Sequence, residues 1–256
     1  VQGVQSIVLD SDYFPVAAIE GRAVPLLKAD DGRAIAAVGT LGDARFANFG
    51  SWRGVQIDAT SGPYIDLFRN LVSWLGGKDS PVVGLIPSLH DSGLQSWLDS
   101  IGVNNQPVSY GDDQDWSSVD LLILDSGQSL AYPQHVTQIE AFLQRGAGVM
   151  AGRHVFLPWE TSTYRPVDGL TGRILTLGGI SWTQDAYQSV DPGTTIQVSA
   201  LLPSRLTQAQ GALEALAREI LDIEDLSAPD RATIATHLRF TGAAQTRLRA
   251  SSRIAL

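Results

Sequence analysis

The sequence predicts an α/β fold with a doubly wound, mostly parallel sheet, an N-terminal β hairpin unit and a C-terminal helical extension. Strand-like apolar runs alternate with helical periodicity between residues 63 and 152. This order favours parallel strands joined by right-handed crossovers. The run 119–125 is apolar on both faces, as is typical of a central parallel strand. We therefore expect it in the middle of the sheet.

The first 50 residues predict a small antiparallel β unit. Short apolar runs occupy residues 6–9, 16–19, 24–29 and 34–39. The turn sequence Asp-Asp-Gly-Arg at 30–33 separates the last two runs, which is a strong hairpin signal. We expect this unit, residues 1–50, to lead into the sheet.

The remaining elements follow from the period of the apolar residues and from the glycines that end helices. Helices are expected at 63–75, 94–101, 133–144 and 167–177, and strands at 81–86, 107–110, 119–125, 148–151 and 194–199. We place an α/β domain at residues 1–203 and a helical connector at 204–256. Within the connector, Ser227, Pro229 and Asp230 combine an N-cap, an early proline and an acid three residues on, which indicates the start of a helix.

Composition excludes several classes of function. The net charge of −9 argues against binding to nucleic acid or an anionic membrane, because both need clustered basic residues. The chain has no cysteine, which excludes thiol nucleophiles and cysteine-ligated metals. No apolar run reaches about 18 residues, so neither a signal peptide nor a membrane span is expected. Because the chain starts at Val1, we expect a processed protein or a piece of a longer one.

A loop rich in aromatic and charged residues follows the strand predicted at 148–151. Carboxyl ends of parallel strands are where α/β folds place ligands, and aromatic faces beside charges suit sugar rings or a partner loop. An alternative is that Phe156 and Trp159 cover the end of the sheet while Arg153 pairs with Glu160. The candidate ligand-binding residues are Arg153, His154, Phe156, Trp159, Glu160 and Tyr164.

The strand ending at Asp125-Ser126-Gly127, the next helix and the run 148–152 resemble the core of class I glutamine amidotransferase-like domains, which are flavodoxin-like. The resemblance covers roughly residues 80–155. It implies a sharp turn that presents a catalytic cysteine, and Met150 stands at the matching position. A thioether cannot be deprotonated to attack a carbonyl, so no catalytic residue is expected there.

A wider arrangement includes Trp-Leu-Gly-Gly at 74–77, the strand at 120–125, the glycine-rich strand near 148 and Gly-Gly-Ile-Ser-Trp at 178–182. It resembles the N-terminal region of M60-like (enhancin-like) metallopeptidases and the TRPM8 channel-associated factors. The resemblance implies an amidotransferase-like module and a helical connector, with a zinc peptidase further along the polypeptide. It also implies a bacterial, secreted or surface-bound protein that acts on O-glycosylated substrates.

The peptidase motif itself is missing from this chain. Its four histidines, at 90, 135, 154 and 237, form no His-Glu-x-x-His sequence, so no zincin site is expected. We therefore expect no metal site and no cofactor. The sequence favours a non-catalytic accessory module, a pseudo-amidotransferase, whose partners are the downstream peptidase domain and a glycan or glycoprotein.

Two alternatives stay open. A hydrolase or amidotransferase would use Ser126 or Ser88 with His154, because both serines follow predicted strands. Neither lies in a Gly-x-Ser-x-Gly sequence, and caps or turns explain them as well. The other alternative is a structural spacer, for which the aromatic loop would pack inward.

Overall fold

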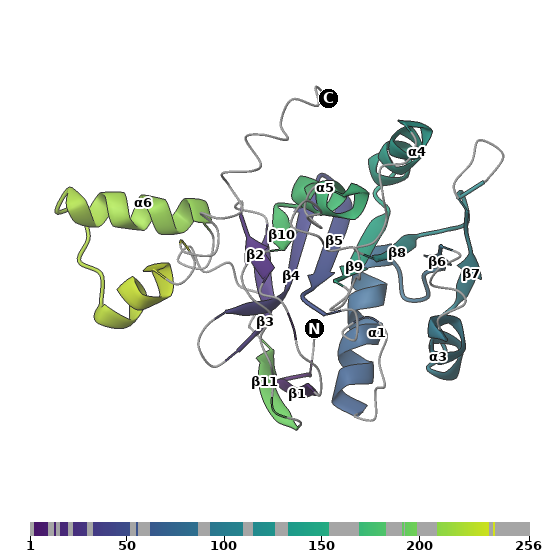
Figure 1. Ribbon diagram of the computed structural model, residues 1–256, viewed down its shortest axis with the longest axis horizontal. Helices are drawn as coiled ribbons and strands as arrows, with labels where there is room; N and C mark the ends of the chain where they lie inside the picture. The colour runs from purple at the N-terminus through teal and green to yellow at the C-terminus, as the bar shows by residue number, and fades with distance from the viewer. Residues whose placement is uncertain are drawn as a thin grey trace.

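The computed structural model describes most of the α/β region and the helical residues that follow it. The described residues are 3–9, 13, 16–19, 23–29, 33–51, 55, 62–86, 93–109, 115–125, 133–153, 169–182, 191, 193–198, 209–235 and 238. They form a mixed α/β structure with eleven strands in one sheet, and a helical hairpin beside it (Figure 1). The predicted α/β class is confirmed.

Five strands form the parallel half of the sheet. Their order is β5 (Ala44–Phe49), β9 (Gly148–Gly152), β8 (Leu121–Asp125), β6 (Val83–Leu85) and β7 (Asn105–Pro107). Each neighbouring pair in this order is parallel. The carboxyl ends of these strands therefore lie along one edge of the sheet, and β8 is central to this half, as the apolar run predicted.

The other half of the sheet is antiparallel. The order continues from β5 through β4 (Ala34–Leu41), β3 (Val24–Lys28), β11 (Thr194–Val198) and β1 (Ser6–Leu9), while β2 (Val16–Ala18) pairs with β4 and with β10 (Ile180–Trp182). The predicted hairpin joins β3 and β4. Its turn is closed by a hydrogen bond of 2.9 Å from the Ala29 N–H to the Arg33 carbonyl.

The prediction of a mostly parallel sheet was wrong, whereas the antiparallel strands predicted within residues 1–50 belong to the same sheet, as expected. Among the described strands, six pairings are antiparallel and four are parallel. Strand β5 joins the halves, because it pairs antiparallel with β4 and parallel with β9. Its sequence, with Arg45 and Asn48 among apolar residues, does not give the apolar run that marked the other strands.

Helices α1 (Gly62–Gly76) and α5 (Leu170–Leu177) pack on opposite faces of the sheet. A Cβ placed on Gly148 would lie 2.5 Å from the Leu75 carbonyl oxygen of α1. A Cβ placed on Gly178, at the end of α5, would lie 2.5 Å from the Phe46 ring. Phe46 is aligned with Val149, the neighbour of Gly148, and neighbouring strand residues face opposite sides.

Two further helices belong to the parallel half. Helix α3 (Leu94–Ser100) contacts β7, and α4 (Pro133–Gln144) lies between β8 and β9 in the chain. The α4 end is fixed to the loop before β8, because the Arg145 guanidinium donates to the carbonyls of Trp116 and Val119. The helices predicted at 94–101 and 133–144 are confirmed to within a residue.

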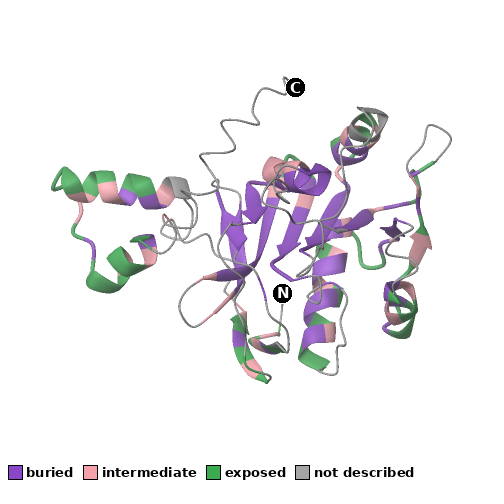
Figure 2. Cartoon of the chain, viewed as in Figure 1, coloured by how far each residue is buried: buried purple, intermediate pink, exposed green. Residues whose placement is uncertain are grey.

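The helical hairpin comprises α6 (Ala209–Ile220) and helical residues 228–235. It has a small core of its own, formed by Ala212, Ala215, Leu226 and Ile234. Ser227 Oγ accepts a hydrogen bond from the Asp230 N–H at 3.3 Å and donates to Asp230 Oδ2 at 2.7 Å, which confirms the predicted helix start. Figure 2 shows the central strands largely buried and the hairpin largely exposed.

Candidate functional site

Buried polar side chains gather at the carboxyl ends of β5 and β9. Among the described residues, the buried polar and charged ones are Asn48, Ser51, Arg153, Thr171 and Ser181. They lie in or just after β5 and β9, in the first turn of α5 and in β10. Helix α5 contacts β5, β9 and β10, and β10 contacts β5. The elements that carry them therefore adjoin one another at the carboxyl ends of β5 and β9, and we call this region the carboxyl edge.

The Phe49 carbonyl, at the end of β5, holds the carboxyl edge together. It accepts hydrogen bonds of 3.2 Å from the Arg153 N–H and from Trp182 Nε1. The Trp182 side chain is fully buried. The next residue, Gly50, donates to the Ile35 carbonyl of β4 at 2.8 Å. The two bonds to the Phe49 carbonyl thus fix the end of β9 and strand β10 to the end of β5.

Asn48 is the most unusual residue of the carboxyl edge. It has no exposed surface, and neither its Oδ1 nor its Nδ2 has a hydrogen-bond partner within the described part of the chain. Its strand neighbours in register are Ala37 and Ala151, and neither carries a hydrogen-bonding side chain. An unsatisfied buried donor or acceptor costs about 1–3 kcal/mol. A polar group kept under such conditions suits a hydrogen bond to a ligand or an enclosed water.

Arg153 directly follows β9 and is 8% exposed. Because side chains alternate along a strand, Arg153 is expected on the same face as Ala151 and Asn48. A guanidinium offers several donors in a fixed plane, and a carboxamide adds both a donor and an acceptor. Together the two groups can bind carboxylate, amide or hydroxyl groups of a ligand.

The predicted loop residues are largely beyond what the structure describes. Arg153 is described, and the structure places it at the carboxyl edge. His154, Phe156, Trp159, Glu160 and Tyr164 lie outside the described residues, as do Ser88 and Ser126.

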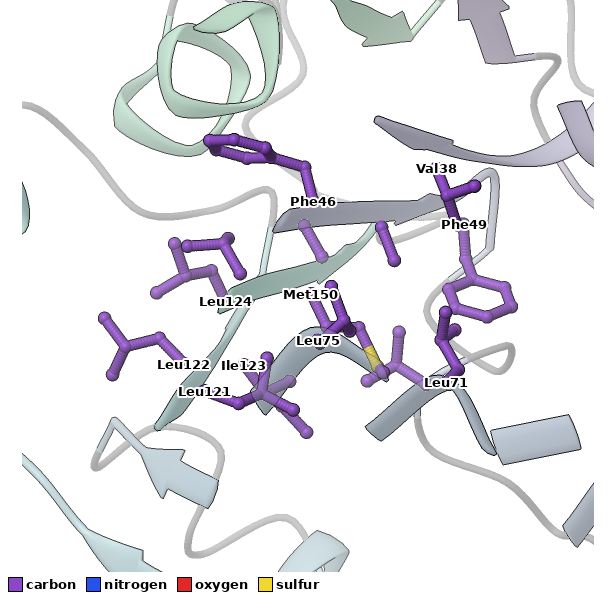
Figure 3. Packing of buried hydrophobic residues seen from close by; sticks show 14 of the residues in the cluster. Val38, Phe46, Phe49, Leu71, Leu75, Leu121, Leu122, Ile123, Leu124 and Met150 are labelled. Atoms are coloured by element: carbon purple, nitrogen blue, oxygen red, sulfur yellow. The ribbon is translucent and has the colours of Figure 1, made fainter. Parts of the chain in front are cut away.

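Met150 lies in the middle of β9, two residues before the strand ends. It is fully buried. Figure 3 shows it among hydrophobic side chains between the sheet and α1, close to Leu75 and Leu71. The chain is extended at this position and the thioether faces the core, so the structure offers no exposed nucleophile at Met150.

The described residues contain no group of three or more His, Cys, Asp or Glu side chains that could hold a metal ion. None of the described helices combines the length and hydropathy needed to cross a membrane.

Sequence reasoning did not find Asn48, Thr171 or Ser181. The sequence gives only a weak indication that Asn48 is unusual, because it is a polar residue between the apolar Ala47 and Phe49. The signal appears only once β5 is known to have strands on both sides.

Three solved structures resemble the chain. The IMPa metallopeptidase from Pseudomonas aeruginosa matches with a TM-score of 0.53 and 20% identity, over 70% of this chain and 20% of that chain. IMPa in complex with T-antigen matches with a TM-score of 0.49 and 19% identity, over 77% and 22% of the two chains. IMPa from Pseudomonas aeruginosa in complex with an O-glycopeptide matches with a TM-score of 0.49 and 20% identity, over 73% of this chain and 21% of that chain.

At these identities the first likeness concerns the fold alone. The chain spans about a fifth of the length of the structures it matches. No curated protein matches it in sequence. The family model described as the immunomodulating metalloprotease N-terminal domain matches residues 9–156, which is more than half of the 256 residues. The chain therefore belongs to the immunomodulating metalloprotease N-terminal domain family.

Proposed function

We propose that this chain is a non-catalytic accessory domain of an M60-like metallopeptidase and that it binds or positions a glycoprotein or protein partner at its carboxyl edge. The accessory role rests on the family match over residues 9–156. Binding at the carboxyl edge rests on one observation, the fully buried Asn48 amide, both of whose polar atoms lack a partner within the described residues.

The non-catalytic part of the proposal is supported by residue chemistry. The sequence has no cysteine and no His-Glu-x-x-His motif. Met150, at the position that the amidotransferase-like resemblance would give to a nucleophile, is buried and cannot ionise. The domain is then a pseudo-amidotransferase whose polar edge is used for recognition rather than for reaction. We place it in a secreted or cell-surface bacterial protein.

The chemistry of the carboxyl edge sets the kind of ligand. Asn48 offers a donor and an acceptor, and Arg153 offers a planar set of donors. An O-glycosylated peptide carries hydroxyl, acetamido and backbone amide groups that match both residues. The loop predicted to bind, with His154, Phe156, Trp159, Glu160 and Tyr164, follows Arg153 directly in the sequence and would supply stacking surfaces for sugar rings.

Calorimetric titration of an O-glycopeptide into the isolated chain tests the proposal. We expect saturable binding that the Asn48→Leu variant loses and that Leu41→Ser keeps, because Leu41 is an exposed residue at the far end of β4. The corresponding peptide without sugar separates recognition of the glycan from recognition of the peptide. Binding of neither peptide, or equal binding by the Asn48→Leu variant, would contradict a ligand site at the carboxyl edge.

Labelling with a fluorophosphonate probe tests the absence of catalysis independently. Activated serines react with such probes, so we expect no labelled peptide when the chain is digested and analysed by mass spectrometry. A labelled peptide containing Ser88 or Ser126 would establish a hydrolase instead.

A further inference from the structure

The helical hairpin exposes large aliphatic side chains on its outer surface. Ile220 is 80% exposed, Leu221 67%, Ile223 58% and Leu213 48%. Leu213, Ala217 and Ile220 follow at spacings of four and three, which places them on one side of α6. Leu221 and Ile223 extend the exposed residues into the turn that follows. We call Leu213, Ile220, Leu221 and Ile223 the apolar stripe.

The apolar stripe takes no part in the core of the hairpin. That core uses Ala212 and Ala215 from α6, together with Leu226 and Ile234. Single exposed aliphatic residues are ordinary, whereas several on one element mark a surface that binds a partner. The hairpin therefore has two apolar sides, and only one of them is covered in the described residues.

The turn after α6 holds the stripe in a defined geometry. Asp222 has a φ of 54°. The Ile223 N–H donates to the Arg218 carbonyl at 2.9 Å and the Asp222 N–H to the Glu219 carbonyl at 3.0 Å, the two bonds of a Schellman motif. This closed turn presents Leu221 and Ile223 with little freedom, and preordering of this kind favours binding.

A second contact fixes the two halves of the hairpin to each other. Arg231 donates through Nε to Glu219 Oε1 at 2.7 Å, and its Nη2 bonds Asp225 Oδ1 at 3.2 Å. The hydrogen bond from Arg231 also lowers the pKa of the Glu219 carboxyl. These bonds join α6, the turn and the second helix.

The hairpin that carries the stripe has a negative net charge. Residues 209–235 contain six acidic residues and two basic ones, a net charge of −4. They are Glu214, Glu219, Asp222, Glu224, Asp225 and Asp230 against Arg218 and Arg231. A surface that fits this one would be apolar at its centre and basic at its rim.

We propose that the apolar stripe is the docking site for another domain of the same polypeptide, which would present an apolar patch with a basic rim. This inference rests on the proposed function, in which the chain is one domain of a peptidase. The structures it resembles are about five times longer than the matched region.

Cysteine labelling tests the docking, because the chain has no cysteine of its own. Ile220→Cys reports on the stripe, and Leu41→Cys, at a residue 46% exposed in β4, is the matched control. Each variant is prepared in the isolated chain and in the longer polypeptide that contains the peptidase domain. Maleimide modification is followed by peptide mass spectrometry.

We expect Ile220→Cys to react at least about tenfold more slowly in the longer polypeptide than in the isolated chain, because a covered thiol reacts only after local opening. Leu41→Cys should react equally in both. Equal rates for Ile220→Cys would overturn the proposal. Protection in the isolated chain that rises with concentration would also overturn it, since a second copy would then cover the stripe.

Failure of this inference can be told from failure of the proposed function. The Ile220→Ser variant of the isolated chain should bind O-glycopeptide as the wild type does, because the stripe is not part of the carboxyl edge. Protection of Ile220→Cys without any glycopeptide binding would leave the docking in place and remove the recognition role.

Discussion

The carboxyl edge and the helical hairpin depart from ordinary burial in opposite directions. At the carboxyl edge the Asn48 amide is fully enclosed, whereas in the hairpin the Ile220 side chain is 80% exposed. An enclosed amide without a partner costs free energy in an isolated domain, whereas an uncovered aliphatic stripe forgoes the gain that burial of its surface would bring. In the two proposals above, the difference corresponds to two kinds of partner, a small polar group that enters the sheet edge and an apolar protein surface that covers the hairpin.

Trp182→Ala is expected to have the largest effect, because it removes the ring that fixes β10 to the end of β5. The ring is fully buried and its Nε1 donates to the Phe49 carbonyl. We expect the free energy of unfolding in urea to fall by about 3–5 kcal/mol. Trp74→Ala, at a tryptophan 36% exposed in α1, is the control and should cost less. Equal losses from both would mean that the carboxyl edge is not specially dependent on β10.

Asn48→Leu should make the isolated chain more stable and less able to bind. Leucine has the same branched arrangement of side-chain heavy atoms and leaves no polar atom unsatisfied, so we expect the free energy of unfolding to rise by about 1–3 kcal/mol. Asn104→Leu, at an exposed asparagine, should change it by less than about 0.5 kcal/mol. A lower free energy of unfolding for Asn48→Leu would show that the Asn48 amide already has hydrogen-bond partners. The carboxyl edge would then differ from the helical hairpin only in being buried.

Asp222→Gly tests the turn that follows α6 in the helical hairpin. Asp222 has a positive φ at the helix end, where glycine is favoured, so we expect the hairpin to gain about 0.5–1 kcal/mol. Hydrogen exchange of the α6 amides measures this gain locally. Exchange that is unchanged or faster would mean that the turn does not limit the stability of the hairpin.

Ile220→Ser should have the smallest effect on the isolated chain. Because the side chain is largely exposed, we expect the free energy of unfolding of the isolated chain to stay within about 0.5 kcal/mol of the wild type. The same change in the longer polypeptide should loosen the docked hairpin and speed hydrogen exchange in α6. A large loss of stability in the isolated chain would place Ile220 in the core of the hairpin.

The sequence predicted the helices and the parallel strands β6, β8 and β9 well, because their apolar periods are read directly from the chain. It placed β7 at 107–110 instead of Asn105–Pro107, and it predicted no strand at β5 (Ala44–Phe49). It did not predict how the halves of the sheet join. Strand β5 interrupts its apolar residues with Arg45 and Asn48, and only its pairing with β4 and β9 explains why Asn48 is enclosed.

Only part of the candidate site could be named from the sequence. Arg153 was found because it follows a clear strand. Thr171 and Ser181 come from α5 and β10, which are distant in sequence, and no local pattern predicts that they meet β5. Burial of polar groups depends on tertiary contacts, so it becomes visible only in the folded chain.

The most direct test of an accessory role compares cleavage of an O-glycosylated protein by the longer polypeptide with and without residues 1–256. Cleavage of a short unglycosylated peptide serves as the control for an intact peptidase domain. We expect that removing the domain lowers cleavage of the glycoprotein while cleavage of the short peptide persists. Unchanged cleavage and binding of the glycoprotein after the deletion would contradict an accessory role for this domain.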